Sequence, residues 1–313
     1  MSWFILALIC ILGWGFADLF YKKSSDSDDG QSHLKIAVWV GLVMGAAAFC
    51  FMPFSETAFS AEGLLVSAIR YSPASLCYII SMVVGYAGLR YLELSIVSPV
   101  QNASGALSVC CMIVYFVLKG KISSFSDAFS PLELIGTVFI AAGMLALAIV
   151  EQRLSRSSAT AEDRRHMSGA LALIFPFLYC VFDTLGTAAD GIILDEETGL
   201  GLGEIDVIIV YGLTFMLAGL CAWIYMFIKN KKPYNVFARG ELTKGAAAVC
   251  EEFGQVFYVY AMAAKPLLAA PMVASYCIVS VLLSRVLLKE KLTVSQYICV
   301  VAVVAGIVML GTA

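Results

Sequence analysis

One pattern occurs twice in this chain, about half a chain length apart. Residues 97–123 and 269–293 each contain a proline, a long apolar run with scattered hydroxyls, and a Leu-Lys-X-Lys sequence followed two residues later by a hydroxyl residue. A small-residue apolar segment follows each copy, at 139–147 and at 301–310. A membrane-length module repeated at this spacing is typical of secondary transporters built from two halves.

The composition excludes a soluble protein. Hydrophobic residues make up 61% of the 313 residues and charged residues 14%, whereas a soluble domain carries about 25% charged residues. We therefore expect an integral membrane protein, and a net charge of −3 favours no nucleic-acid partner. The apolar run that starts at Met1 has no cleavage site after it, which indicates a first membrane span rather than a signal peptide.

Apolar runs of about 20 residues, the length that crosses the hydrocarbon core as a helix, occur ten times. We expect every run to be helical, because other isolated backbone would be left unpaired in lipid. The sequence thus predicts an all-α integral membrane fold with ten transmembrane helices. The runs lie near 2–21, 34–54, 73–92, 94–118, 131–150, 168–189, 205–228, 245–264, 266–288 and 293–312.

The ten runs form two sets of five that can be aligned. Asp183, for example, follows Asp18 by 165 residues, about half the chain. Because five is odd, the second set must enter the membrane from the opposite side, and a solute site is expected where the two sets meet. We therefore predict two inverted five-helix repeats, at 1–150 and 168–313, joined by a cytoplasmic linker at 151–167.

Lysine and arginine are distributed unequally between the loops. Loops after spans one, three, five, seven and nine hold 16 of the 20, which places these loops in the cytoplasm and both termini outside. The acidic segment 190–206 then lies on the outer side, and its glycines disfavour a long helix. We interpret it as a solvated loop or as a lid that attracts cations.

Three short motifs resemble those of a known family. They are Trp14-Gly15 in the first span, YVYAM at 258–262 ahead of Pro271, and LKEKL at 288–292 before the last span. On these residues the sequence resembles the drug/metabolite transporter superfamily, specifically its ten-helix EamA-type branch. The resemblance extends over essentially the whole chain. It implies alternating-access carriage of a small solute, often outward and often exchanged for protons, without indicating the cargo.

Asp18 and Asp183 occupy equivalent places in the two predicted halves. Each follows an aromatic residue by four positions, Trp14 and Tyr179, so that ring and carboxyl share a helical face. An ionisable group inside the membrane costs about 2.5–3.5 kcal/mol on insertion scales and marks a cavity or a partner. We predict that these four residues bind a substrate, with a cation suited to acid and ring together. For Asp18, an interfacial pair with Lys22 is the alternative.

A polar stripe marks the predicted eighth span. Glu251, Gln255, Tyr258 and Met262 recur there at helical spacing. A carboxylate in a low-dielectric pocket can bind and release a proton near neutral pH. Glu251 is therefore predicted to couple transport to protons, with Asp183 as second candidate, while Gln255 and Tyr258 bind substrate. The alternative for Glu251 is a place in the first turns of a helix, where acids meet the helix dipole.

Polar residues of the fourth and ninth spans complete the candidate site. Gln101 and Asn102 offer neutral donors and acceptors, and Tyr276 adds another ring with a hydroxyl. We predict that all three contact the substrate; interhelical hydrogen bonds, each worth about 0.6 kcal/mol, are the alternative. Neither histidine has a partner at ligand spacing, and we predict no metal site, cofactor or enzymatic activity.

These features predict a multi-pass protein of the cell membrane that works as a proton-linked secondary transporter. Acids outnumber bases among the candidate residues, which favours a small cationic or zwitterionic metabolite or drug-like solute. Export is the direction that the resemblance implies. The expected partners are solute, protons and lipid bilayer, with the chain as a monomer or homodimer. An uncoupled facilitator or importer, or a membrane protein without transport activity, is the alternative.

Overall fold

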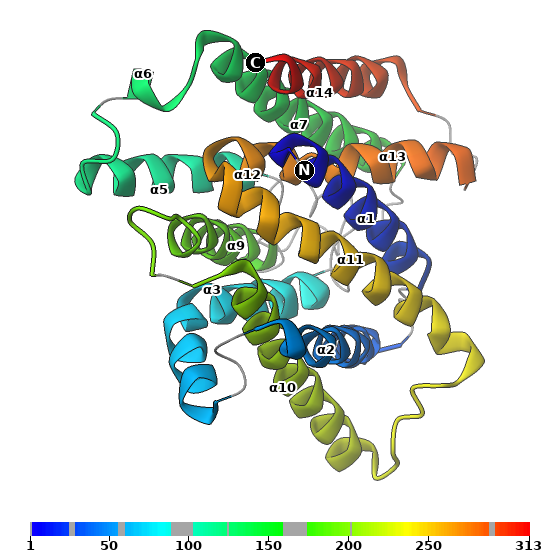
Figure 1. Ribbon diagram of the computed structural model, residues 1–313. Helices are drawn as coiled ribbons and strands as arrows, with labels where there is room; N and C mark the ends of the chain where they lie inside the picture. The colour runs from blue at the N-terminus through cyan, green and yellow to red at the C-terminus, as the bar shows by residue number, and fades with distance from the viewer. Residues whose placement is uncertain are drawn as a thin grey trace.

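A computed structural model describes residues 2–24, 29–55, 60–88, 103–123, 125–158, 174–200, 202–287 and 292–313. All regular structure in these ranges is helical (Figure 1). Within the described ranges, seven helical segments are long and apolar enough to cross a membrane, and Ser104–Leu118 is a shorter apolar helix.

Each of the ten predicted spans has a counterpart in the structure, nine as one helix and the ninth as a pair of helices. The first set is α1 (Trp3–Ser24), α2 (Ser32–Phe51), α3 (Ala61–Gly88), α5 (Ser104–Leu118) and α7 (Pro131–Ser158). The second set is α9 (Ile174–Ile193), α10 (Glu204–Asn230), α11 (Leu242–Ala264), the pair α12 (Pro266–Ala274) and α13 (Tyr276–Leu287), and α14 (Val294–Thr312). The predicted all-α membrane fold with ten helices is confirmed. Short helices η1 (Met52–Phe54), α6 (Phe125–Ala128) and η2 (Arg239–Glu241) lie in the connections.

The predicted start of the third span, residue 73, is wrong. α3 begins at Ala61 and continues through Pro73. Proline has no N–H, so the carbonyl of Ile69 loses its usual helical partner. The hydroxyl of Ser72 donates to that carbonyl instead, at 2.8 Å, which is one way in which membrane helices satisfy a backbone group that proline leaves free.

The predicted ninth span is not one helix. The chain from Pro266 to Leu287 divides at Ser275 into α12 and α13. Pro271 lies inside α12 and removes a backbone donor, and the Ser275 hydroxyl bonds the carbonyl of Met272 at 2.6 Å. A discontinuous helix of this kind exposes polar groups within a membrane protein, usually beside a cavity.

The helices pack in matching pairs across the two sets. The contact of α1 with α11 is matched by that of α9 with α3, α1 with α13 by α9 with α5, and α2 with α11 by α10 with α3. Three further pairs join equivalent helices of the two sets, so the exchange leaves them unchanged: α2–α10, α7–α14 and α5–α12. Exchanging the two sets therefore reproduces these six kinds of contact, as expected for two related halves.

The repeat boundaries 1–150 and 168–313 stay a prediction. α7 continues to Ser158, so the first part of the predicted linker 151–167 is helical. Residues 159–173 lie outside the described ranges.

Glycines let the paired helices approach closely. A side-chain carbon at Gly41 of α2 would lie 2.5 Å from the carbonyl oxygen of Phe215 and 2.9 Å from the Cα of Gly219, both on α10. A carbon at Gly306 of α14 would lie 2.6 Å from the carbonyl oxygen of Gly136 on α7. These small faces therefore pack inside the molecule.

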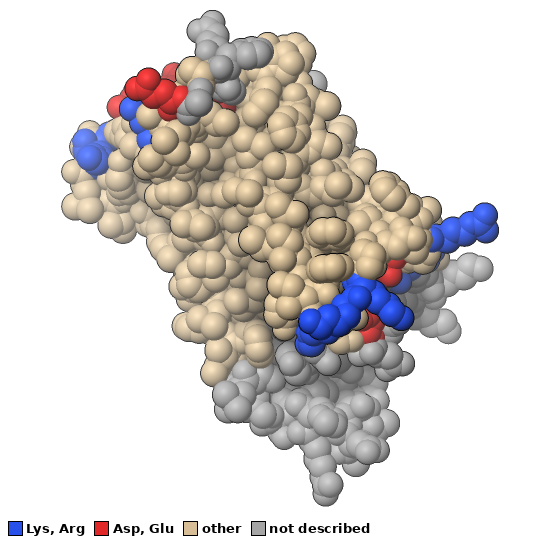
Figure 2. Space-filling model, turned by 90° about the horizontal axis from the view of Figure 1, so that it is seen from below, with Lys and Arg blue, Asp and Glu red and all other residues tan. Residues whose placement is uncertain are grey.

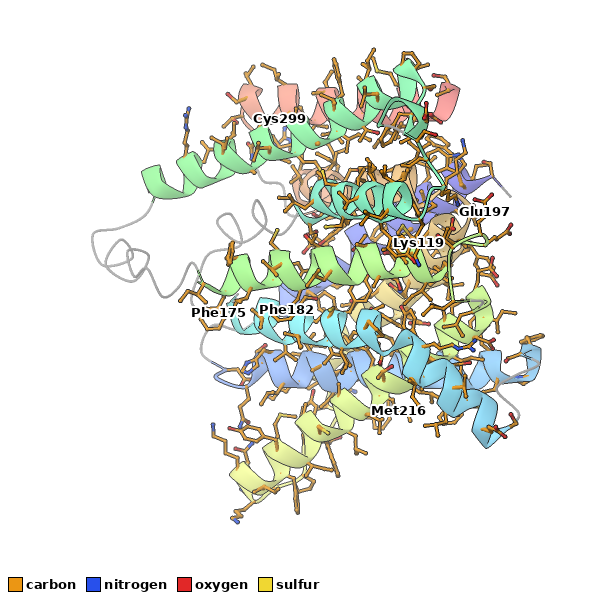
Figure 3. All side chains as sticks on the ribbon, turned by 90° about the vertical axis from the view of Figure 1, so that its left-hand side faces the viewer. Lys119, Phe175, Phe182, Glu197, Met216 and Cys299 are labelled. Atoms are coloured by element: carbon orange, nitrogen blue, oxygen red, sulfur yellow. The ribbon has the colours of Figure 1, made fainter. Side chains whose placement is uncertain are left out.

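Polar connections gather at the two ends of the bundle. Lys35, near the start of α2, pairs with Asp29 at 2.7 Å and with Glu241 of η2 at 3.4 Å. Lys121, which follows α5, pairs with Asp195, which follows α9. In Figure 3, Lys119 and Glu197 lie at one end and Phe175, at the start of α9, at the other.

The surface between the two ends is apolar. Figure 2 shows the charged residues of one face near its ends and a broad band without charge between them. Large apolar side chains such as Phe49, Leu65 and Val301 are exposed. An exposed apolar band of this kind suits contact with lipid.

Candidate functional site

A cavity of about 180 Å³ lies where the two sets of helices meet. α1, α3, α5 and α9–α13 all contribute to its wall. Gln101 and Asn102, two of the ten residues predicted from sequence, lie outside the described residues. The other eight all line the cavity: Trp14, Asp18, Tyr179, Asp183, Glu251, Gln255, Tyr258 and Tyr276. These eight residues therefore share one cavity, and their roles in binding and proton coupling stay predictions.

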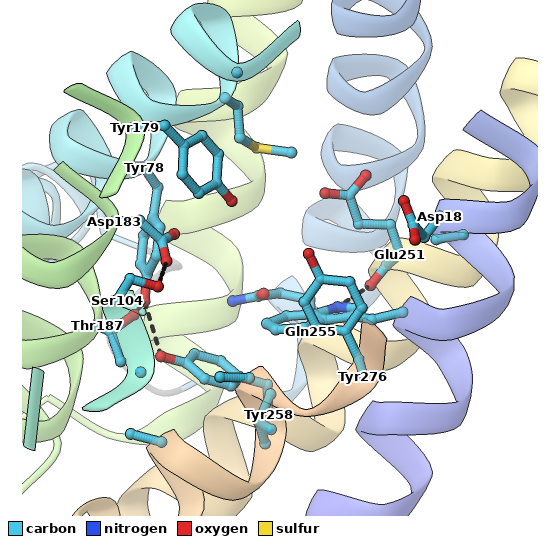
Figure 4. A pocket seen from close by; sticks show the side chains of 18 of the residues that line it. Asp18, Tyr78, Ser104, Tyr179, Asp183, Thr187, Glu251, Gln255, Tyr258 and Tyr276 are labelled. Atoms are coloured by element: carbon cyan, nitrogen blue, oxygen red, sulfur yellow. Dashed lines mark hydrogen bonds between the residues drawn. The ribbon is translucent and has the colours of Figure 1, made fainter. Parts of the chain in front are cut away.

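One wall of the cavity joins α1 to α11. Asp18 and Glu251 lie together on this side (Figure 4). The hydroxyl of Tyr21 donates to Oε2 of Glu251, and the indole N–H of Trp14 donates to the backbone carbonyl of Glu251 at 3.1 Å. Both donors come from α1, so Glu251 is held at the contact between two helices.

The opposite wall carries the second acid. Asp183 of α9 receives a hydrogen bond from the hydroxyl of Ser104 at the start of α5. Figure 4 shows this pair across the cavity from Asp18 and Glu251. No lysine or arginine of the described ranges forms an ion pair with Asp183 or Glu251.

Aromatic rings fill the space between the acidic walls. The ring of Trp14 lies 5.2 Å from that of Tyr258 and 5.7 Å from that of Tyr276, the latter edge-on at 87°. Tyr276 reaches this position because α13 begins there, directly after the break at Ser275. Ring faces next to carboxylates form a setting that attracts cations.

Gln255 supplies a neutral polar group to the same cavity. Its side chain is buried, and its Nε2 has no hydrogen-bond partner among the described residues. Because buried polar atoms are nearly always paired, this N–H group is a donor that a bound solute can use.

Sequence reasoning missed several lining residues. Tyr21 follows Asp18 by three positions and Thr187 follows Asp183 by four, so helical spacing from either acid would have found them. Tyr78 of α3 has no acid at helical spacing on its own span. It lines the cavity because α3 packs against α9, a relationship that no local pattern contains.

The acidic segment 190–206 is only partly a loop. α9 continues to Ile193 and α10 begins at Glu204, so Asp190 is in a helix and fully buried. The apolar residues that follow Asp190 allow α9 to continue. The interpretation of the whole segment as a solvated loop or a lid is therefore wrong at both of its ends.

Asp195, two residues after the end of α9, links two connections at one end of the bundle. It accepts hydrogen bonds from Lys121 and, at 2.8 Å, from both the backbone N–H and the hydroxyl of Thr198. Burial alone raises the pKa of the Asp195 carboxyl, but the bonds from Lys121 and Thr198 outweigh it and hold the pKa below its ordinary value. The α5–α6 and α9–α10 connections are thereby joined.

Comparison with known proteins supplies a family match over part of the chain and a fold over nearly all of it. Residues 198–312 match the EamA-like transporter family. No curated protein sequence matches the chain. A solved structure described only as "Crystal structure of protein" has a TM-score of 0.63 and 14% identity, over 98% of this chain and 96% of that chain. At this identity the likeness shows the fold alone, and it extends over both sets of helices.

Proposed function

We propose that this chain exchanges a small cationic or zwitterionic solute for protons. The match of residues 198–312 to the EamA-like transporter family makes it a membrane transporter rather than an enzyme. One observation carries the proposal. Asp18, Asp183 and Glu251 share a single cavity whose described lining contains no lysine, arginine or histidine.

The lining favours a cation. A carboxylate supplies the charge, and the faces of Trp14, Tyr258 and Tyr276 supply cation–π attraction of about 0.5–2 kcal/mol. Gln255 can bind a neutral polar part of the same solute. An anion would meet repulsion from Asp183 and Glu251, neither of which pairs with a lysine or arginine of the described ranges.

The cavity size favours a small metabolite over a bulky drug. Sites for drug-sized ligands measure about 300–1,000 Å³, and an apolar cavity of about 150 Å³ holds benzene. At about 180 Å³ the cavity suits an amine or amino acid of similar size.

Proton exchange follows from competition for the same carboxylates. A buried carboxylate without a fixed cation is stabilised by taking up a proton or by pairing with a bound cation. A solute cation and a proton therefore displace each other from the acidic walls. With protons entering down their gradient, such an exchange moves the solute outward.

The test is flux into vesicles that contain the purified protein. Amines, amino acids and quaternary ammonium compounds are screened with and without a pH gradient across the vesicle membrane. We expect saturable uptake that rises with an outward proton gradient and is lost in Glu251→Gln. Flux that ignores the gradient would instead identify an uncoupled facilitator.

Glu252→Gln is the matched control for that variant. Glu252 is the next residue of α11 and is buried, but it is not part of the cavity lining. The same charge is removed from the same helix, so proton-driven flux should persist. Equal loss in both variants would refute the specific role of Glu251.

A further inference from the structure

Asp190 is a buried carboxylate that the proposed function does not use. It follows Asp183 by seven residues, two helical turns along the same face of α9. Its side chain is fully buried and is not part of the cavity lining. In the described part of the chain no lysine or arginine pairs with it.

Hydroxyl groups take the place of a counter-charge. Tyr71 of α3 donates to Oδ1 of Asp190 at 2.7 Å, and Tyr78, two turns further along α3, donates to Oδ2 at 2.9 Å. Both rings are buried. A buried carboxyl held by neutral donors can exist with or without its proton, because no fixed positive charge requires it to be ionised.

Tyr78 also connects Asp190 to the cavity. Its hydroxyl lies 2.8 Å from the hydroxyl of Tyr258 and 3.3 Å from that of Thr187. Tyr78, Thr187 and Tyr258 all line the cavity, and Figure 4 shows their side chains converging. An unbroken row of oxygen atoms therefore runs from Tyr258 through Tyr78 to Asp190.

Counting protons along this row shows that it has two states. A tyrosine hydroxyl has one proton to donate. When Asp190 is ionised, Tyr78 donates to it, so Tyr258 must donate to Tyr78. When Asp190 is protonated, its own O–H can donate to Tyr78, and both hydrogen bonds of the row reverse. The orientation of the Tyr258 O–H bond at the cavity wall therefore depends on whether Asp190 is protonated.

We propose that Asp190 is a second proton-binding site of the transport cycle, connected to the cavity by the hydroxyls of Tyr258 and Tyr78. The role in transport rests on the proton exchange proposed above. An aqueous proton from the cavity joins Oη of Tyr258 while the proton of that hydroxyl passes to Oη of Tyr78. The proton of Tyr78 passes in turn to Oδ2 of Asp190. Each O–H bond that forms is matched by one that breaks, and release follows the same steps in reverse.

The titratable groups that face Asp190 in the described structure are tyrosines and one other carboxyl, so none of them supplies a positive charge. From α3 it faces Tyr71 and Tyr78, from α11 Tyr258, and along α9 Asp183, while Tyr211 of α10 packs edge-on against the two α3 rings at 6.4 and 5.8 Å. α12 has no titratable residue. On α5, Cys110 and Cys111 are exposed, and Tyr115 donates to the carbonyl of Thr198.

The experiment measures proton binding directly and needs no solute. Infrared difference spectra of the purified protein in lipid, recorded between two pH values, report carbonyl bands of carboxyl groups that change protonation. We expect one such band to be absent in Asp190→Asn and retained in Glu251→Gln. Asparagine can accept from Tyr71 and donate to Tyr78, so the fold should persist. A full set of bands in Asp190→Asn would overturn the proposal.

A matched pair of variants tests the path. Tyr71→Phe and Tyr78→Phe each remove one hydroxyl donor to Asp190, but only Tyr78 contacts Tyr258. After a pH jump, Tyr78→Phe should slow the rise of the Asp190 band about tenfold or more, equal to about 1.4 kcal/mol in barrier, while Tyr71→Phe leaves the rate near that of the parent. Equal slowing in both variants would show that protons do not reach Asp190 through Tyr258 and Tyr78. This comparison does not require that Asp190→Asn folds.

The two proposals fail in different ways. An unchanged spectrum in Asp190→Asn, together with proton-driven flux that depends on Glu251, overturns the Asp190 site alone. Flux that ignores the pH gradient in the parent protein overturns proton exchange, and with it any use of Asp190 in transport.

Discussion

Asp18 and Asp183 lie on opposite walls of one cavity, although 165 residues separate them in sequence. α1, which holds Asp18, and α9, which holds Asp183, make matching contacts in the two sets of helices. Each set therefore contributes an aspartate to the same space, and the second set adds Glu251. In the structure the space between the two acids is thus lined from both sets of helices.

Removing the charge of Asp183 should weaken the binding of a cationic solute. A charge-assisted hydrogen bond contributes about 1.5–3 kcal/mol, so Asp183→Asn should raise the dissociation constant about ten- to one-hundredfold. Calorimetric titration with a cation identified by the flux screen measures this. Ser104→Ala is the control, since it removes the donor to Asp183 but keeps the charge, and it should cost much less. Unchanged affinity in Asp183→Asn would exclude the carboxylate as a ligand.

The aromatic ring of Tyr276 should contribute more to the affinity for a cation than its hydroxyl does. Tyr276→Phe keeps an aromatic face beside Trp14 and should bind a quaternary ammonium ion nearly as the parent does. Tyr276→Leu removes the face and should lose about 1–2 kcal/mol of affinity. The same titration measures both variants. Equal losses of affinity in Tyr276→Phe and Tyr276→Leu would show that a hydrogen bond, and not cation–π attraction, dominates at this position.

Local spacing in the sequence predicted much of the site. Trp14 with Asp18, and Glu251 with Gln255 and Tyr258, were found because residues three or four apart share a helical face. The ten spans were found because lipid admits few backbone conformations.

Features that depend on contacts between helices were not predicted. Tyr78 reaches Asp190 only through the register of α3 against α9. Asp190 was assigned to a loop because it begins an acidic segment with several glycines, and nothing near it in sequence shows which hydroxyls satisfy its carboxyl. The break at Ser275 lies in a segment that is apolar on both sides, so hydropathy gives no signal of it.

Acid should remove the stabilising contribution of Asp195. Burial raises its pKa, but the bonds from Lys121 and Thr198 lower it further than burial raises it. A group with a lowered pKa in the folded state stabilises above its unfolded pKa of about 3.9, and the contribution is lost as pH falls through the folded value. Asp195→Asn should thus lower thermal stability near neutral pH, with a difference from the parent that shrinks on acidification below about pH 4.

Melting curves of both proteins at stepped pH values measure this difference. Lys121→Met should show the same pH dependence, because it removes the partner that favours the ionised form. A difference in melting temperature that stays constant across the pH range would show that Asp195 acts through packing and not through its charge.

The hydroxyl of Ser72 should stabilise the protein only while residue 73 is proline. Ser72→Ala leaves the carbonyl of Ile69 without a donor inside a membrane helix, at a cost of about 1–3 kcal/mol. Pro73→Ala restores a backbone N–H four residues after Ile69, so adding Ser72→Ala to it should cost little. Unfolding by detergent titration of the parent, both single variants and the double variant gives the coupling energy.

Ser81→Ala is the matched control for this cycle. The Ser81 hydroxyl also bonds a carbonyl three residues earlier in α3, that of Tyr78, at 2.9 Å. Residue 82 is methionine and keeps its N–H, so the Tyr78 carbonyl retains a helical donor when the hydroxyl is removed. Ser81→Ala should therefore cost less than Ser72→Ala. If Ser72→Ala costs the same with Pro73 as with alanine at that position, the hydroxyl does not compensate for the proline, and the path of α3 through Pro73 must be stabilised by packing alone.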